Sequence, residues 1–172
     1  MLHSGDLFPS VTFARAGGGE IRLPDDTVGD FGVILFYRGA WSSSCNLQLA
    51  AFSRASNEFA SEGIKVVSVS VDDRETAEGL VGKLSLPFPV AYGVDAREVS
   101  AVTGIHVNED PVFLEASGFV LNPEGRIETV IYTSSDLSED RIVTTVDSTG
   151  PIGRLMPDEV LRLVRHLKSS AM

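Results

Sequence analysis

Two apolar runs separated by a helical segment constrain the fold of this chain more than any other feature. Residues 33–37 read Val-Ile-Leu-Phe-Tyr, and residues 65–71 read Lys-Val-Val-Ser-Val-Ser-Val. Short runs this rich in apolar and β-branched residues are typical of strands covered on both faces. Apolar residues recur between them at helical spacing: Leu49, Phe52, Ala55 and Phe59. Gly63 then ends the helix, so the order predicts a parallel pair of strands joined by a crossover helix.

The rest of the chain continues to alternate helices with strands. The patterns predict helices over residues 74–84, 96–103 and 157–168, an extended segment over 86–90 and a hairpin over 119–132. The hairpin is the clearest of these, because two apolar runs flank an Asn-Pro-Glu-Gly turn. In the last helix, proline occupies the first position and apolar residues follow at helical spacing.

The resulting order is that of the thioredoxin fold with an N-terminal extension. In the extension, Thr12–Phe13 and Ile21–Leu23 are expected to pair as a small hairpin with Gly17-Gly18-Gly19 at its turn. No repeat, low-complexity tract or domain linker is visible. We therefore expect one α/β domain over residues 1–172, with a thioredoxin-like fold, a central mixed sheet flanked by helices, and an N-terminal β-hairpin extension.

Charge and cysteine content exclude several classes of function. The 14 basic and 24 acidic residues give a net charge of −10, which opposes binding to nucleic acid or to an anionic membrane surface. No stretch approaches the ~20 apolar residues of a membrane span, and the first residues lack a secretory pattern, so we expect a cytoplasmic protein. A single cysteine excludes an internal disulfide and a cysteine-rich metal site, and no metal or cofactor is expected.

Cys45 is the residue that most clearly points to chemistry. It follows the first buried strand, where the crossover helix should begin. A thiol at a helix N-terminus faces unpaired N–H groups and the positive end of the helix dipole, and both favour the reactive thiolate. The small polar run Ser42-Ser43-Ser44 supplies hydroxyl and amide donors beside it. The carboxyl end of a parallel strand is also where α/β folds place their sites, although a lone cysteine is more often a small buried hydrophobe.

The segment around Cys45 resembles the active-site region of the alkyl hydroperoxide reductase/thiol-specific antioxidant (AhpC/TSA) family, the peroxiredoxins and their thioredoxin-like relatives. One branch carries Phe-Tyr-Arg-Gly-x-Trp-Cys-Pro-x-Cys, and the chain matches it at Phe36, Tyr37, Arg38, Gly39, Trp41 and Cys45. Ser42 and Cys45 also fall on the last two fixed positions of the peroxiredoxin motif Pro-x-x-x-Thr/Ser-x-x-Cys. Residues 86–89 and 118–125 resemble the Leu-Pro-Phe-Pro and hairpin segments of the same family.

Three departures from the family pattern restrict the chemistry. Ser42 replaces the first cysteine of the dithiol branch, which excludes dithiol exchange within the motif. Arg38 replaces the proline of the peroxiredoxin motif, and Ala116 stands where the family has a distal arginine. Arg38, Arg126 and Arg154 are the candidates to replace that arginine, and Arg38 is chosen because it is nearest in sequence.

The resemblance implies a one-cysteine, peroxiredoxin-like oxidoreductase that acts as an antioxidant. Cys45 would attack a hydroperoxide, with Ser42 assisting, Arg38 as charge partner and Trp41 lining the pocket unless it packs in the core. An external thiol, a thioredoxin-like protein or Cys45 of a second subunit would then reduce the sulfenic acid. The family's exposed strand edge is compatible with a homodimer.

A second hypothesis assigns no catalysis to the chain. In this alternative, a thioredoxin-fold module kept one cysteine and now binds a protein or a ligand. The missing arginine and the three serines favour it. The polar stretch over residues 133–156 is either a lid, a partner surface or an ordinary connection.

Overall fold

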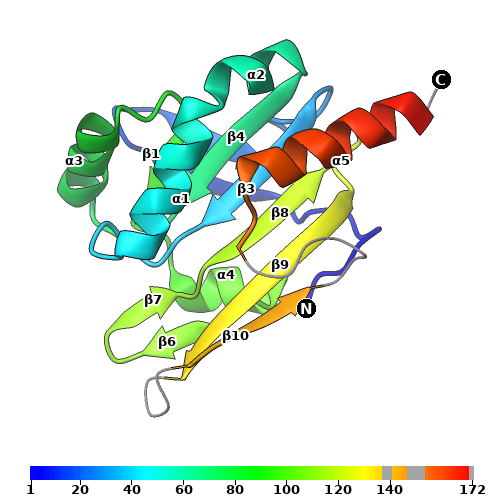
Figure 1. The fold of residues 1–172 in the computed structure, drawn as a ribbon. Coiled ribbons are helices and arrows are strands. Elements are labelled where there is room, and N and C mark those ends of the chain that lie inside the picture. The colour runs from blue at the N-terminus through cyan, green and yellow to red at the C-terminus, as the bar shows by residue number, and fades with distance from the viewer. Residues whose placement is uncertain (137–140, 147–153, 171–172) are drawn as a thin grey trace.

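The computed structural model describes residues 1–136, 141–146 and 154–170. An eight-stranded mixed sheet forms its centre, with strand order β10-β9-β8-β3-β4-β5-β1-β2. The strands are β1 (Val11–Arg15), β2 (Glu20–Leu23), β3 (Phe31–Phe36), β4 (Ile64–Val69), β5 (Val90–Tyr92), β8 (Ser117–Leu121), β9 (Ile127–Asp136) and β10 (Arg141–Val146), and β6 (Val107–Glu109) and β7 (Val112–Leu114) form a separate hairpin. Figure 1 shows α1, α2 and α5 along the face of the sheet that is turned to the viewer.

The predicted strand–helix–strand unit is confirmed. β3 and β4 pair in parallel with Ile34 opposite Val67, and both strands are almost entirely buried. The crossover segment is two helices rather than one, α1 (Ser43–Arg54) and α2 (Ser56–Ser61). The backbone leaves helical geometry at Ala55, with φ −87° and ψ 2°. Both helices still face the same core, because the rings of Phe52 and Phe59 pack edge to face at 5.5 Å.

The remaining predicted helices and hairpins are present. α3 (Arg74–Leu84) and α4 (Ala96–Thr103) have the predicted bounds, and α5 (Pro157–Ser170) is two residues longer than predicted. α3 begins at its N-cap Asp73, whose carboxylate accepts a hydrogen bond from Thr76 N–H at 2.8 Å. The N-terminal extension pairs as β1–β2 with Phe13 opposite Ile21, and β8 pairs with β9 in the predicted hairpin.

Two features were not predicted. Each strand of the β6–β7 hairpin has only three residues, which is too short for a period-2 pattern to be recognised. β10 lies within the stretch 133–156, for which a lid, a partner surface or an ordinary connection is expected from the sequence, and it pairs antiparallel with β9. Its sequence Arg-Ile-Val-Thr-Thr-Val is rich in β-branched residues. This composition favours a strand, so β10 could have been predicted from the sequence. The other parts of that prediction, residues 137–140 and 147–153, lie outside the described residues.

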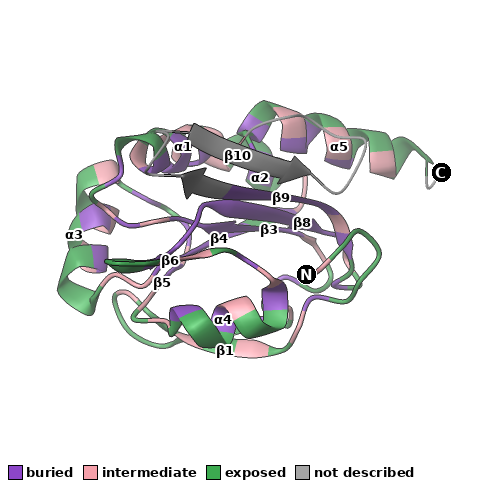
Figure 2. Cartoon of the chain, turned by 90° about the horizontal axis from the view of Figure 1, so that it is seen from below, coloured by how far each residue is buried: buried purple, intermediate pink, exposed green. Residues whose placement is uncertain are grey.

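The sheet separates two hydrophobic cores. One contains Phe52, Phe59, Leu80, Val160 and Cys45 and is covered by α1, α2, α3 and α5. The other contains aromatic residues of the sheet and Val99 of α4. Figure 2 shows the buried sheet edge-on, with α1, α2 and α5 above it and α4 below. Within the described ranges, no helix has the length and apolar character of a membrane span.

Candidate active site

Cys45 lies in the first turn of α1, directly above the carboxyl end of β3. Ser42 caps this helix, and its hydroxyl oxygen accepts a hydrogen bond from Cys45 N–H at 3.3 Å. Ser42 is buried and Cys45 has no exposed surface. The cap therefore fixes the backbone of the cysteine. Because Cys45 is in the first turn, it lies at the N-terminal end of α1, which is the positive end of the helix dipole.

Arg154 provides the charge next to the sulfur. Its Nη1 donates to Cys45 Sγ at 3.4 Å and to Gln48 Oε1 at 3.4 Å. A guanidinium has only donors and stays charged in proteins, so this contact places a positive charge directly beside the sulfur. The structure thus brings together Cys45, Ser42 and Arg154.

Gln48 and Leu155 hold the Arg154 segment in place. Gln48 Nε2 donates to the carbonyl oxygen of Leu155 at 2.8 Å. The Leu155 side chain packs against Gly118, where an added Cβ would lie only 2.9 Å from Leu155 Cβ. The remaining cleft between Gln48, Ala116 and Arg154 has a volume of about 10 Å³, enough for about one water molecule. Because Cys45 has no exposed surface, a hydroperoxide reaches the sulfur only when the side chains around it move.

Arg38 is not the charge partner of the thiol in this structure. Its Nε forms a partly buried ion pair with Glu115 Oε2 at 3.2 Å, and its guanidinium lies 5.9 Å from the centre of the Phe113 ring. Successive side chains of an extended segment point to opposite faces. Tyr37 packs into the core that contains Cys45, so the next residue points away from it.

The other sequence-based candidates lie elsewhere. Arg126 is exposed and donates to the backbone oxygen of Gly5 at 3.1 Å. Trp41 is 60% exposed and packs edge to face on Phe113 at 5.1 Å. It does not line the cleft beside Cys45, and it does not pack in the core.

Asp72 shapes the loop that leads to the cysteine. Its Oδ2 accepts a hydrogen bond from Ala40 N–H at 2.8 Å. Burial raises the pKa of Asp72 above its usual value, and the bond from Ala40 partly opposes this shift. Burial also raises the pKa of the neighbouring Tyr37 to about 12, which keeps the phenol neutral.

Gln48 was a residue that sequence reasoning missed. It lies three residues after Cys45, so both share one face of α1. This spacing was the only available signal. No group of three or more His, Cys, Asp and Glu side chains suited to a metal ion occurs in the part of the chain that the structure describes.

Residues 4–130 match the model of the AhpC/TSA family. The chain belongs to this family. Alkyl hydroperoxide reductase C of Mycolicibacterium smegmatis is 28% identical over 193 aligned positions, which cover 100% of this chain and 88% of the relative. A peroxiredoxin of Thermotoga maritima is 27% identical, over 96% of this chain and 72% of its own length.

Solved structures confirm the thioredoxin-like fold expected of an AhpC/TSA protein. Peroxidoxin BcpB of Mycobacterium tuberculosis superposes with a TM-score of 0.75 at 17% identity, covering 97% of this chain and 99% of that one. The yeast mitochondrial 1-Cys peroxiredoxin gives 0.73 at 20% identity, with 99% and 78% covered. At these identities the likeness supports the fold alone.

Proposed function

We propose that this AhpC/TSA-family protein is a one-cysteine, peroxiredoxin-like thiol peroxidase that reduces hydroperoxides through Cys45. The hydrogen bond from Arg154 Nη1 to Cys45 Sγ carries this proposal. A cysteine that serves only as a small hydrophobe needs no cation beside its sulfur, and Arg154 is partly buried against this one. The family membership supports the same chemistry.

The reaction follows from the geometry of the site. The Cys45 thiolate attacks the terminal oxygen of the hydroperoxide, a sulfur–oxygen bond forms and the oxygen–oxygen bond breaks. The leaving alkoxide takes a proton and departs as an alcohol, or as water when the substrate is hydrogen peroxide. Cys45 becomes a sulfenic acid. Arg154 stabilises the negative charge on the sulfur and the oxygens, while Ser42 holds the cysteine backbone.

Return to the thiol needs a second reductant, because the chain has one cysteine. The yeast neighbour is described with a thiol resolving mechanism via glutathione/thioredoxin systems. By analogy, we assign reduction of the Cys45 sulfenic acid to a small thiol or a thioredoxin-like protein. The cytoplasmic location and the homodimer that the sequence analysis expects remain predictions.

A non-catalytic binding module is the competing function, and one observation favours it. Cys45 has no exposed surface, and the cleft between Gln48 and Arg154 holds about one water. An inert thiol would be expected in such a setting if the Arg154 segment never moved.

Rapid mixing with hydrogen peroxide separates the two functions. Reduced protein is mixed with peroxide, Trp41 fluorescence is followed, and Cys45 is trapped with dimedone for mass spectrometry. A peroxidase gives oxidation much faster than that of free cysteine and a trapped sulfenic acid, and the Cys45→Ser variant gives neither. A thiol that reacts no faster than free cysteine would overturn the proposal.

A further inference from the structure

A second pocket lies away from Cys45, in a gap of the central sheet. It has a volume of about 410 Å³, within the ~300–1,000 Å³ range of small-molecule sites. Side chains from both cores line it, since Phe59 and Val66 belong to one core and Ile21 and Val67 to the other. The pocket therefore opens where β4 and the β1–β2 hairpin diverge.

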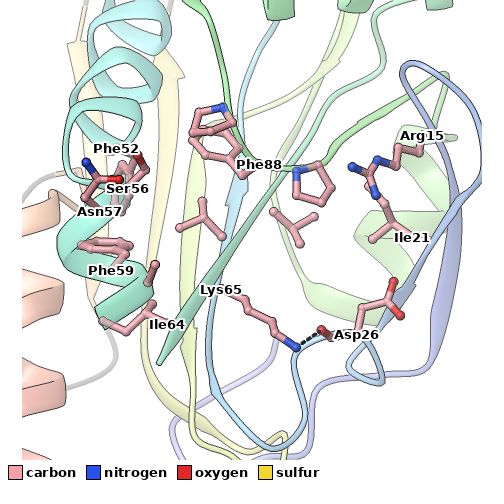
Figure 3. A pocket seen from close by; sticks show the side chains of 15 residues that line it. Arg15, Ile21, Asp26, Phe52, Ser56, Asn57, Phe59, Ile64, Lys65 and Phe88 are labelled. Carbon is pink, nitrogen blue, oxygen red and sulfur yellow. Dashed lines mark hydrogen bonds between the residues drawn. The ribbon is translucent and has the colours of Figure 1, made fainter. Parts of the chain in front are cut away.

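Apolar groups form most of the wall. Figure 3 shows Phe52 and Phe59 of the helices on one side, Phe88 between, and Ile21 on the opposite side. Aromatic and aliphatic walls of this kind bind the apolar body of a ligand. Ala60 of α2 also lines the pocket and is itself exposed.

Beside this pocket, backbone N–H and C=O groups of β4 have no hydrogen-bond partner on a neighbouring strand in the described part of the chain. β5 pairs with β4 only at Ser68 and Val69, and Ser68 N–H donates to Pro89 at 3.0 Å. Alternate residues of a strand direct their N–H and C=O groups to the same side, so those of Val66 face the gap. Val66 is 8% exposed, and within the described ranges no protein group bonds to it from that side. These backbone groups of Val66 are therefore available to water or to a ligand in the pocket.

The charged side chains at the rim of the pocket indicate the charge of the ligand. Arg15 and Lys65 line the pocket together with one carboxylate, Asp26. Asp26 already accepts a hydrogen bond from Arg22 N–H at 2.8 Å, and Lys65 donates to the Asp26 carbonyl oxygen at 3.4 Å and pairs with Asp30 at 3.4 Å. The Arg15 guanidinium has no ion pair within the described residues. Asp30 neutralises Lys65, so Arg15 is the rim cation left without an ion pair among the described residues, on a chain whose net charge is −10.

We infer that this pocket binds an apolar small molecule with a carboxylate group, such as a medium-chain fatty acid. The apolar body lies against Phe59 and Phe88, and the carboxylate lies at the rim near Arg15. The site is separate from the Cys45 chemistry and does not depend on it.

Two-dimensional NMR of the full chain with added decanoate tests the inference. Decanol, which has the same chain length and no charge, is the control ligand, and both are kept below the concentrations at which they aggregate. We expect decanoate to shift the amide signals of Ile64 to Val67 and of Phe88, and to bind more tightly than decanol. Arg15→Glu should weaken decanoate binding about fivefold to tenfold and leave decanol binding unchanged. Arg22→Glu, an exposed position on the same hairpin outside the pocket, is the matched control. Ala60→Trp, at an exposed helix position, should block both ligands.

The inference is overturned by equal binding of decanoate and decanol, by shifts that map outside the pocket, or by no shifts at millimolar decanoate. Shifts at the same residues that depend on protein concentration without ligand would indicate a second copy of the chain and would also overturn it. The Cys45→Ser variant should bind decanoate like the parent protein, so loss of peroxidase activity and loss of ligand binding are distinguishable.

Discussion

Arg154 donates a hydrogen bond to the sulfur of Cys45 at 3.4 Å, although 109 residues separate them in the chain. The same guanidinium nitrogen lies 3.4 Å from Gln48 Oε1, and the next residue, Leu155, is bound by the Gln48 amide. One helix face therefore supplies the nucleophile and the side chain that anchors its charge partner.

Removing the Arg154 charge should slow peroxide reduction. We expect Arg154→Leu to lower the second-order rate of Cys45 oxidation by roughly 10²-fold, because a donor to the reacting sulfur and oxygens is lost. Stopped-flow fluorescence with hydrogen peroxide measures the rate. Arg126→Leu is the control, since Arg126 is exposed and its side chain donates to the carbonyl oxygen of Gly5, away from Cys45. An unchanged rate in Arg154→Leu would remove Arg154 from the mechanism.

Gln48 should act on the rate through the position of Arg154. In Gln48→Leu the Leu155 carbonyl loses its donor, and we expect a stability loss of about 1–3 kcal/mol together with slower Cys45 oxidation. Gln48→Glu keeps an acceptor for Arg154 but offers no donor to Leu155, so it should retain more of the rate than Gln48→Leu. Urea unfolding and stopped-flow rates measure the two effects. Equal rates in both variants would contradict this role.

Gly118 should tolerate no side chain, because a Cβ there would lie 2.9 Å from Leu155 Cβ. We expect Gly118→Ala to displace the Arg154–Leu155 segment and to destabilise the protein by about 1–3 kcal/mol. Gly79→Ala in α3 is the matched control, since an added Cβ meets nothing within 4 Å. That variant should gain about 0.5–1 kcal/mol. Thermal unfolding distinguishes them, and equal effects of the two substitutions would refute the packing argument.

The Arg38–Glu115 pair should contribute to stability and not to the chemistry. Glu115 is buried with 3% of its side chain exposed, and Arg38 is partly buried with 13% exposed. Arg38→Met removes this partner from the carboxylate and should cost about 1–3 kcal/mol. The double variant Arg38→Met/Glu115→Leu should recover part of that loss. Urea unfolding gives the energies. The rate of Cys45 oxidation by peroxide in the folded variants should match that of the parent protein. A large decrease in this rate would show that Arg38 contributes to the reaction.

Asp72 should make stability depend on pH in the unusual direction for a carboxylate. Burial raises its folded pKa above the ordinary 3.8, so the native state holds its proton to higher pH than the unfolded chain does. Its contribution is fully present below pH 3.8 and is lost as the pH rises through the folded pKa. Asp72→Asn should therefore gain stability relative to the parent as the pH rises toward neutrality. Urea unfolding from pH 3 to 7 tests this, and a difference independent of pH would contradict it.

The sequence alone determined the elements whose signals are local. The β3–α1–β4 unit and the bounds of α3 and α4 follow from periodicity and from caps such as Asp73, which act within a few residues of the chain. The position of Cys45 at a helix start belongs to the same class, because strand, cap and helix are contiguous. The short β6–β7 hairpin was not predicted, because strands of three residues are too short to show an alternating pattern of apolar and polar residues.

The tertiary structure decided which charge meets the thiol. Arg38 is nearest to Cys45 in sequence, yet the alternation of an extended segment turns it toward Glu115 while Tyr37 enters the core of Cys45. Arg154 reaches the sulfur only because Leu155 packs on Gly118 of β8 and bonds to Gln48 of α1. Such contacts join segments far apart in the chain, and no local pattern encodes them, since they depend on how the sheet brings its strands together.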